Sequence, residues 1–259
     1  MTLSPKAKQK LRSTIFLLGT FAVWEVLCLV FNVSTFVLPR PSQIMITLVE
    51  RFPALLPSLI QTLNETLIGF ALGVIVGVVI GVVIGSSKTA YDVAYPLLVG
   101  FSSIPKVAVV PVFVLWFGAG FLPAVLTAIV ISIFPIVVNV AAGLATTEPE
   151  LEDVLKSLGA SHIEILWNVG LPRTLPYFFA SLKVAITLAF VGSVLSETVA
   201  ANTGIGNAML VAASNFDVPL VFAALFLLAF LGVALYGIFA MVERRVCGWA
   251  YRKNDFALG

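Results

Sequence analysis

The segment TTEPELEDVLKSLGASHIEILWNVGLP, residues 146–172, is the longest polar interval between the apolar blocks of this chain. It holds five of the thirteen carboxylates and the single histidine, His162. Apolar residues recur at helical spacing on both sides of Gly159, and Leu171-Pro172 ends the pattern. The pattern predicts two short amphipathic helices joined at a glycine elbow. Their apolar stripe needs another polypeptide to cover it.

The composition around this segment is that of a polytopic membrane protein. Hydrophobic residues make up 60% of the 259 residues and charged residues 11%, against roughly 25% charged residues in a soluble domain. The net charge of +2 is too small to indicate nucleic-acid binding. Cys28 and Cys247 lie far apart in the sequence, which argues against a disulfide framework.

Six apolar stretches are long enough to span a bilayer. They cover residues 14–33, 58–85, 90–117, 123–145, 175–199 and 219–241. The stretch Ser102-Ser103-Ile104-Pro105-Lys106 and Pro111 interrupt the third one, and such a break is tolerated only inside protein or beside water. Residues 34–57 are predicted to form an extracytoplasmic loop with a short interfacial helix, closed by Pro53 and Pro57. The predicted fold class is an all-α membrane protein in a single domain, residues 1–259.

The cationic side chains are distributed unequally across this topology. Eleven Lys and Arg residues fall on the side that holds both termini and residues 146–172, against Arg40 and Arg51 on the other side, while Lys106 and Lys183 fall within spans. An excess of cations marks the cytoplasmic side. We therefore expect both termini and residues 146–172 in the cytoplasm.

Glycines recur every fourth residue in the second span, at positions 69, 73, 77, 81 and 85. One face of this helix is therefore bare backbone, which permits the close approach of a neighbouring helix within a membrane. The period predicts a packing seam rather than a ligand site.

Motifs for catalysis or for nucleotide binding are not found in the sequence. Gly85-Ser86-Ser87-Lys88-Thr89 lacks the second glycine and the loop length of a phosphate-binding loop. One histidine cannot form a metal site alone, and His162 is interpreted as a solvated or interface residue. We expect no enzymatic activity and no cofactor on this chain, with ATP bound by a partner subunit if transport is active.

The spacing of Asp153, Gly159, Val169 and Leu171-Pro172 resembles the cytoplasmic EAA motif of permease subunits of bacterial ABC importers. The head of the motif departs from the family pattern. Asp153-Val154-Leu155 stands in place of the triplet, so that the acid is kept in type and both alanines are replaced. Val169 stands in place of an isoleucine.

Four further stretches widen the resemblance to most of the chain. They are Leu38-Pro39-Arg40-Pro41, Ile104-Pro105 with Pro111, Leu115-Trp116-Phe117-Gly118, and Glu197 with Gly204-Ile205-Gly206. The combination is similar to the permeases of the nitrate, sulfonate and taurine importer group, whose members also move bicarbonate and thiamine or riboflavin precursors. The resemblance implies a MetI-like type I importer core in the bacterial inner membrane and a small, anionic solute. It also implies a homodimer, two ATP-binding subunits and an extracytoplasmic binding protein.

The same resemblance implies that residues 146–172 are a coupling loop seated on the ATPase. The candidate coupling residues are Glu152, Asp153, Leu155, Gly159, Ala160, Val169, Leu171 and Pro172. The candidate pathway residues are Ser103, Pro105, Lys106 and Glu197. Two interpretations of Lys106 stay open: it lines the pathway and offers a cation to an anionic solute, or it snorkels outward or pairs with Glu65 or Glu197.

A secondary transporter or channel without an ATPase partner is the alternative function. It would explain the broken third span, but such proteins usually carry more ionisable groups inside the membrane and show internal repeats. A membrane-embedded enzyme would need a catalytic constellation, and the sequence offers none.

Overall fold

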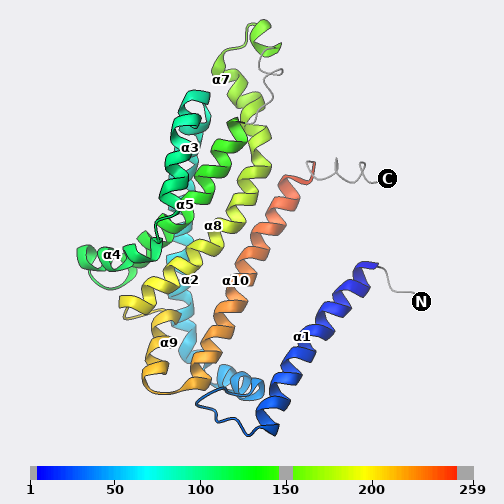
Figure 1. Ribbon diagram of the computed structural model, residues 1–259, viewed down its shortest axis with the longest axis vertical. Helices are drawn as coiled ribbons and strands as arrows, with labels where there is room; N and C mark the ends of the chain where they lie inside the picture. Colours follow the sequence, from blue (N-terminus) through cyan, green and yellow to red (C-terminus); the bar gives the residue numbers. More distant parts are fainter. Residues whose placement is uncertain (1–4, 146–153, 250–259) are drawn as a thin grey trace. The chain divides into compact units, whose positions relative to one another are not determined.

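The computed structural model describes residues 5–145 and 154–249, and these residues form helices joined by short connections (Figure 1). The described residues contain no β-strand, which agrees with the predicted all-α fold class. The α-helices are α1 (Pro5–Val30), α2 (Pro41–Gly85), α3 (Lys88–Ser102), α4 (Val110–Phe117), α5 (Phe121–Ala145), α7 (His162–Ile165), α8 (Leu171–Ala200), α9 (Ile205–Ser214) and α10 (Val218–Val246). A 3-10 helix, η1 (Lys106–Val109), precedes α4, and a π-helix, η2 (Leu166–Gly170), precedes α8.

One compact unit comprises residues 1–58 and 208–229. Within it, the rings of Phe21 and Trp24 in α1 pack on Phe226 in α10, with centroids 5.7 and 6.3 Å away. The backbone N–H and the hydroxyl of Ser42 donate to the two carboxylate oxygens of Glu25 at 3.0 and 2.7 Å. The acid in the first span thus has a local polar partner at the start of α2.

The second unit comprises residues 59–207 and 230–259, and α5 packs against α8 at its centre (Figure 1). The buried residues along these two helices are largely small or β-branched, among them Ala124, Ala128, Ile136, Ala141, Ala185 and Ala189. Small side chains let helix backbones approach closely where lipid gives no hydrophobic drive.

The glycine period of α2 lies against α5, which confirms the predicted packing seam. A Cβ added to Gly77 would lie 3.0 Å from the Cβ of Ile136, and one added to Gly81 would lie 2.7 Å from the Cβ of Val140. Real Cβ atoms do not tolerate the shorter of these distances. The seam therefore needs glycine because the two backbones are in contact.

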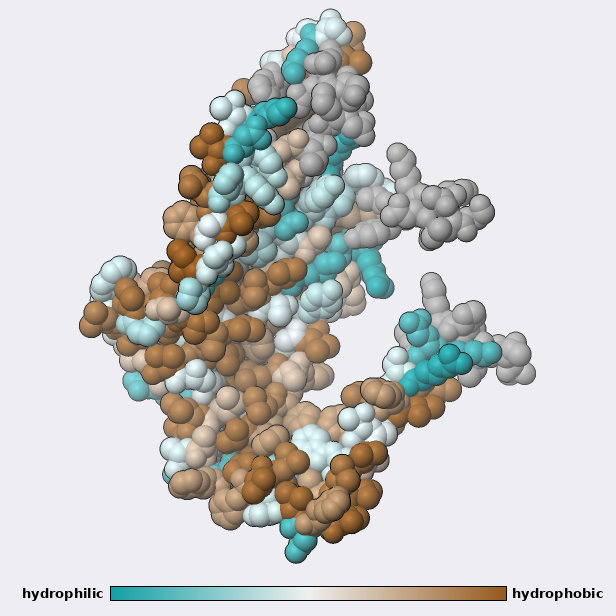
Figure 2. Space-filling view, viewed as in Figure 1, coloured by the Kyte–Doolittle hydropathy of each residue, from teal (hydrophilic) through white to brown (hydrophobic). Residues whose placement is uncertain are grey.

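Large apolar side chains cover much of the visible surface (Figure 2). On α2, Ile75, Val79 and Val83 are about 60% exposed and follow the same period of four as the glycines, offset by two residues. An offset of two residues turns the side chain to the opposite side of the helix. This face is therefore suited to lipid or to another apolar surface.

Within the described residues, five helices are long and apolar enough to cross a membrane, and a bent pair could form a sixth span. The pair joins α3 to η1 and α4 at an angle of 77°, with the break between Ser102 and Lys106. Pro105 precedes η1, and Pro111 lies in the first turn of α4, where its missing N–H leaves no bond unmade. The predicted interruption of the third span is confirmed.

Two predicted helix ends are wrong, and prolines caused both errors. Helix α2 continues from Pro41 through Pro53 and Pro57, so only residues 31–40 form the connection after α1. Both prolines are exposed and lie four residues apart on one side of the helix, so α2 can open there without straining a packed face. Residue 58 is the last residue of α2 that belongs to the first compact unit.

Leu171-Pro172 also fails to end the helix that begins at His162. Helices α7, η2 and α8 follow one another without a break. A proline ring clashes with the carbonyl four residues earlier in a regular α-helix. The π-helical turn Leu166–Gly170 is wider, and it lies where Pro172 needs that room.

Candidate functional site

The elbow at Gly159 ends one helical turn with its φ at +85°, in the left-handed region. The N–H of Ala160 donates to the carbonyl of Leu155 and the N–H of Gly159 donates to the carbonyl of Lys156, both at 3.0 Å. This pair of bonds forms a Schellman ending, which satisfies helix carbonyls and favours glycine at the left-handed position. The positive φ explains why the sequence carries glycine here.

Ser161 begins the next helix by a reciprocal cap. Its N–H donates to Oε2 of Glu164 at 2.8 Å, and the N–H of Glu164 donates back to the Ser161 hydroxyl at 3.3 Å. The spacing Ser-x-x-Glu is that of a capping box. One helix therefore ends and the next begins within residues 159–161. The backbone geometry of the predicted glycine elbow is confirmed.

Both sides of the elbow expose large apolar side chains. Leu158 is 77% exposed, and Val154, Ile163 and Trp167 are also more than half exposed. The predicted coupling residues Leu155, Ala160, Val169 and Leu171 are partly buried, and Pro172 is exposed. Glu152 and Asp153 lie outside the described residues. The exposed apolar groups are what a docking surface requires, while the coupling role itself stays a prediction.

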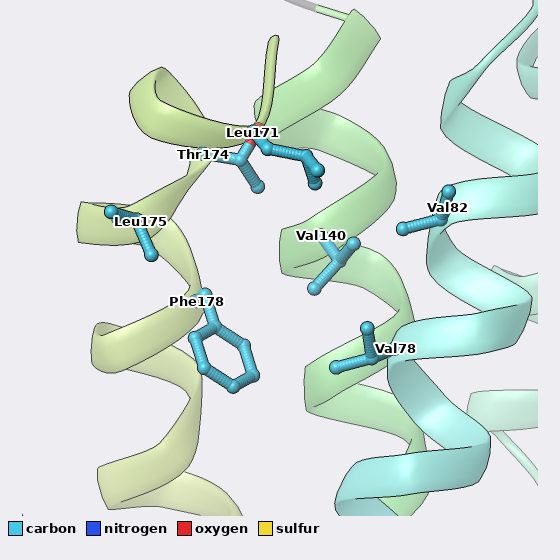
Figure 3. A pocket seen from close by; sticks show the side chains of 7 residues that line it. All are labelled: Val78, Val82, Val140, Leu171, Thr174, Leu175 and Phe178. Atoms are coloured by element: carbon cyan, nitrogen blue, oxygen red, sulfur yellow. The ribbon is translucent and has the colours of Figure 1, made fainter. Parts of the chain in front are cut away.

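The base of this segment is built into the helix packing of the second unit. The side chains of Val78, Val82, Val140, Leu171, Thr174, Leu175 and Phe178 line a pocket of about 240 Å³ between α2, α5 and α8 (Figure 3). Leu171 belongs both to the predicted coupling segment and to this pocket. The Thr174 hydroxyl donates to the carbonyl of Gly170 at 2.8 Å, so the polar atom among these residues is already bonded to backbone. The accessible lining of the pocket is therefore apolar and suits an apolar group.

Lys106 lies at the break of the third span and is partly buried. Its Nζ donates to the carbonyl of Ser102 at 3.1 Å and lies 5.2 Å from the centroid of the Phe134 ring. It lines an otherwise apolar hollow of about 330 Å³. A cation over an aromatic face is stabilised electrostatically. Ser103 and Pro105 are exposed beside it.

Glu197 is fully buried and does not join Lys106. Its carboxyl group instead contacts Thr62, Gly206 and Glu65. The sequence left open a pairing of Lys106 with Glu65 or Glu197. The structure instead pairs Lys106 with the Ser102 carbonyl and the Phe134 ring. The four candidate pathway residues fall into two places, and their role in a pathway stays a prediction.

The contact between Glu65 and Glu197 escaped the sequence analysis. The residues are far apart in the chain, and each acid alone fits a polar contact within a helix bundle. The one available signal was local, because Gln61, Thr62, Glu65 and Thr66 gather polar groups within six residues of an apolar span. Across residues 5–145 and 154–249, no three His, Cys, Asp or Glu side chains gather as metal ligands would.

Comparison with known families gives a match over residues 69–247 to "Binding-protein-dependent transport system inner membrane component". The chain is 31% identical to the formylaminopyrimidine transport permease protein of Halalkalibacterium halodurans, over 96% of this chain and 99% of the relative. It is 36% identical to the riboflavin transport system permease protein of Chloroflexus aurantiacus, over 60% of this chain and 58% of the relative. A putative aliphatic sulfonates transport permease protein of Bacillus subtilis is 27% identical, over 88% of this chain and 83% of the relative.

Among solved structures, the fold is similar to a chain of the inward-facing MetNI methionine ABC transporter. The TM-score is 0.65 at 19% sequence identity, and the match covers 74% of this chain and 95% of that chain. The likeness at this identity concerns the fold, and it agrees with the MetI-like core that the sequence predicts.

Proposed function

Because the chain belongs to the family of binding-protein-dependent transport system inner membrane components, we propose that it is the permease subunit of an ATP-driven importer. In this proposal the chain transports a small solute across the inner membrane after an extracytoplasmic binding protein has delivered it. Two ATP-binding subunits supply the energy, and a second copy of this chain completes the pathway. The chain itself needs no cofactor.

The elbow at Gly159 is the observation that carries this proposal. Its two helix ends are fixed by backbone bonds and a capping box, yet Leu158 and Ile163 face outward. A rigid turn with exposed apolar groups is suited to a groove on a partner, because little conformational entropy is lost on docking. The ATP-binding subunit is the partner that family membership favours. A movement of that subunit would reach α8 directly, since α7, η2 and α8 are continuous.

Reconstitution tests the proposal. The chain, an ATP-binding subunit and a binding protein from the same source are placed in proteoliposomes, and solute uptake is measured with ATP or with an ion gradient. We expect uptake that requires ATP and all three components. Uptake driven by an ion gradient without the ATP-binding subunit would support the secondary transporter instead.

For the solute, we place a pyrimidine-type vitamin precursor first and an aliphatic sulfonate second. The relative that transports formylaminopyrimidine matches nearly the full length of both chains at 31% identity, whereas the aliphatic sulfonate relative has 27%. One observation supports the sulfonate as the second candidate solute. Lys106 lines an apolar hollow as a cation, and a small organic anion would fit both properties.

Replacing Lys106 by Met separates the two solute classes. The variant keeps the apolar stem and removes the charge, so we expect sulfonate uptake to fall by about tenfold, the equivalent of about 1.4 kcal/mol, and pyrimidine uptake to persist. Lys106→Arg is the matched control, because it keeps the charge. Full sulfonate uptake by Lys106→Met in an intact complex would remove Lys106 from the pathway.

A further inference from the structure

The carboxyl group of Glu197 in α8 joins residues of α2 and of the first turn of α9, all within the second unit. Its Oε1 accepts a hydrogen bond from the Thr62 hydroxyl at 2.6 Å, and its Oε2 accepts one from the backbone N–H of Gly206 at 2.7 Å. The hydroxyl oxygen of Thr62 in turn accepts from the N–H of Ile205 at 2.9 Å. One buried acid in α8 thus holds the first turn of α9 to α2.

Glu65 is a second fully buried acid at the same place, and its carboxyl group is in hydrogen-bond contact with that of Glu197. The side-chain amide of Gln61 donates to Oε1 of Glu65 at 2.7 Å. The other oxygen, Oε2 of Glu65, is buried and has no hydrogen-bond partner in the part of the chain that the structure describes. The site therefore contains an unpartnered oxygen beside a second carboxyl group.

Within residues 5–145 and 154–249, the hydrogen-bond donors that face the two acids are all neutral. From α2 they meet an amide and a hydroxyl, and from the start of α9 they meet a backbone N–H. The next polar contact along α2 and α8 is between the hydroxyls of Thr66 and Ser193, at 2.6 Å. Among the described residues, neither acid has an ion pair, and the only ionisable group recorded in contact with either acid is the other one.

The backbone closes tightly over this pair. Gly204 has a φ of +95°, and a Cβ there would overlap the carboxyl group of Glu197. A Cβ on Gly206 would lie 2.8 Å from the Cβ of Glu197. Both acids are fully buried by this chain alone, so a partner subunit or a lipid headgroup cannot bring a cation to them without opening the helices.

Two carboxylates in contact repel strongly in a medium of low dielectric constant, and burial without a counter-ion adds to the cost. A proton on one acid removes one charge and provides the donor that a bond between two carboxyl groups requires. We propose that Glu65 and Glu197 bind one proton between them, and that this acid pair fastens the first turn of α9 to α2 and α8. The unpartnered Oε2 of Glu65 is the atom at which the proton is held, and water is its source.

Loss of the proton leaves two anions in contact, and their repulsion pushes the Glu197 carboxylate away from its donors Thr62 and Gly206. The first turn of α9 then loosens at alkaline pH. The site is a proton-dependent fastening that is independent of the proposed transport function, because it concerns only contacts within this chain.

Infrared spectroscopy of the full chain in lipid nanodiscs tests the site. We expect the C=O stretching band of a buried, protonated carboxylic acid at neutral pH, and its loss in Glu65→Gln. Glu25→Gln is the matched control, since Glu25 is an acid in a span whose partner is Ser42. Glu197→Gln should shift the band rather than abolish it, because Glu65 stays buried without a counter-ion, so Glu65→Gln carries the test.

Hydrogen exchange of a peptide that covers residues 201–207 tests the consequence. At alkaline pH this peptide should exchange at least about tenfold faster in the wild type than in Glu65→Gln at the same pH, because glutamine cannot lose the proton. At neutral pH the two should be equal. Absence of the band from the wild type, its persistence in Glu65→Gln, or equal exchange at alkaline pH would overturn the proposal. Recovery of protection by sodium without the band would show a cation site instead.

Discussion

At the scale of single residues, Gly159 gives a prediction that separates backbone strain from docking. Its φ is +85°, and an added Cβ would meet no described residue within 4 Å. Alanine should therefore cost only about 1 kcal/mol of backbone strain, without any clash. We predict that Gly159→Ala retains transport, whereas Gly159→Trp remains folded and inserted but hydrolyses ATP without transport. The ATPase rate and the uptake rate of the reconstituted complex are measured for each variant.

Gly118 supplies the control for this comparison. Its φ is +78° and its ψ is 174°, a region that is essentially restricted to glycine, so tryptophan there introduces at least as much backbone strain away from the elbow. Wild-type transport by Gly159→Trp would contradict the coupling interpretation. Equal uncoupling by Gly118→Trp would do so too, since the effect would then follow from strain alone.

A second residue-scale prediction concerns the ion pair of Lys183 in α8 with Glu243 in α10. Their Nζ and Oε2 atoms lie 2.5 Å apart, and the glutamate side chain is only 4% exposed. Removing the lysine takes a close cationic partner away from a desolvated carboxylate, which weakens the packing of α8 on α10. We predict that Lys183→Met lowers the free energy of unfolding by about 3 kcal/mol, as measured by denaturant titration in micelles. Adding Glu243→Leu should recover part of the loss, and a double variant no more stable than the single one would contradict this.

At the scale of elements, the glycine seam of α2 predicts a sharp difference between two helical glycines. A Cβ on Gly77 would meet Ile136 at 3.0 Å, whereas one on Gly237 in α10 meets nothing within 4 Å. We predict that Gly77→Leu lowers the free energy of unfolding by about 1–3 kcal/mol or prevents folding, because α2 and α5 must separate. Gly237→Leu should be near neutral or stabilising. Equal melting temperatures for the two variants would show that the seam is not tightly packed.

This seam was predictable from sequence because its cause is periodic. A glycine at every fourth position has one interpretation in a membrane helix, and α5 is the neighbour that fills it. The broken third span was predictable for a similar reason, since Pro105 and the charge at Lys106 both disfavour a straight apolar helix.

The starts of α2 and α8 were mispredicted because the sequence shows that a proline lacks an N–H. It does not show how the chain accommodates that proline. The exposed prolines of α2 and the π-helical turn before Pro172 each absorb a proline within a continuous helix. The contact of Glu65 with Glu197 was equally invisible, because it depends on the packing of α2 against α8 and on the close approach of Gly204 and Gly206.

At the scale of the whole molecule, the number of crossings depends on the bent pair of α3 with η1 and α4. If that pair crosses the membrane, residues 31–40 and the elbow at Gly159 are separated by three crossings and lie on opposite sides. If it is re-entrant, they are separated by two crossings and lie on the same side. The positive-inside distribution of Lys and Arg favours three crossings.

Single cysteines at Ser34 and Ser157 decide between these topologies, because both serines are exposed and lie in the two connections at issue. The native Cys28 and Cys247 are buried, and burial raises the pKa of the Cys247 thiol, so the background of labelling should be low. We predict that an impermeant maleimide labels Ser34→Cys in spheroplasts and labels Ser157→Cys only after the membrane is opened. Labelling of both variants from outside would mean five crossings, and it would place the elbow where no ATP-binding subunit could reach it. That outcome would remove the coupling role of Gly159 together with the sixth span.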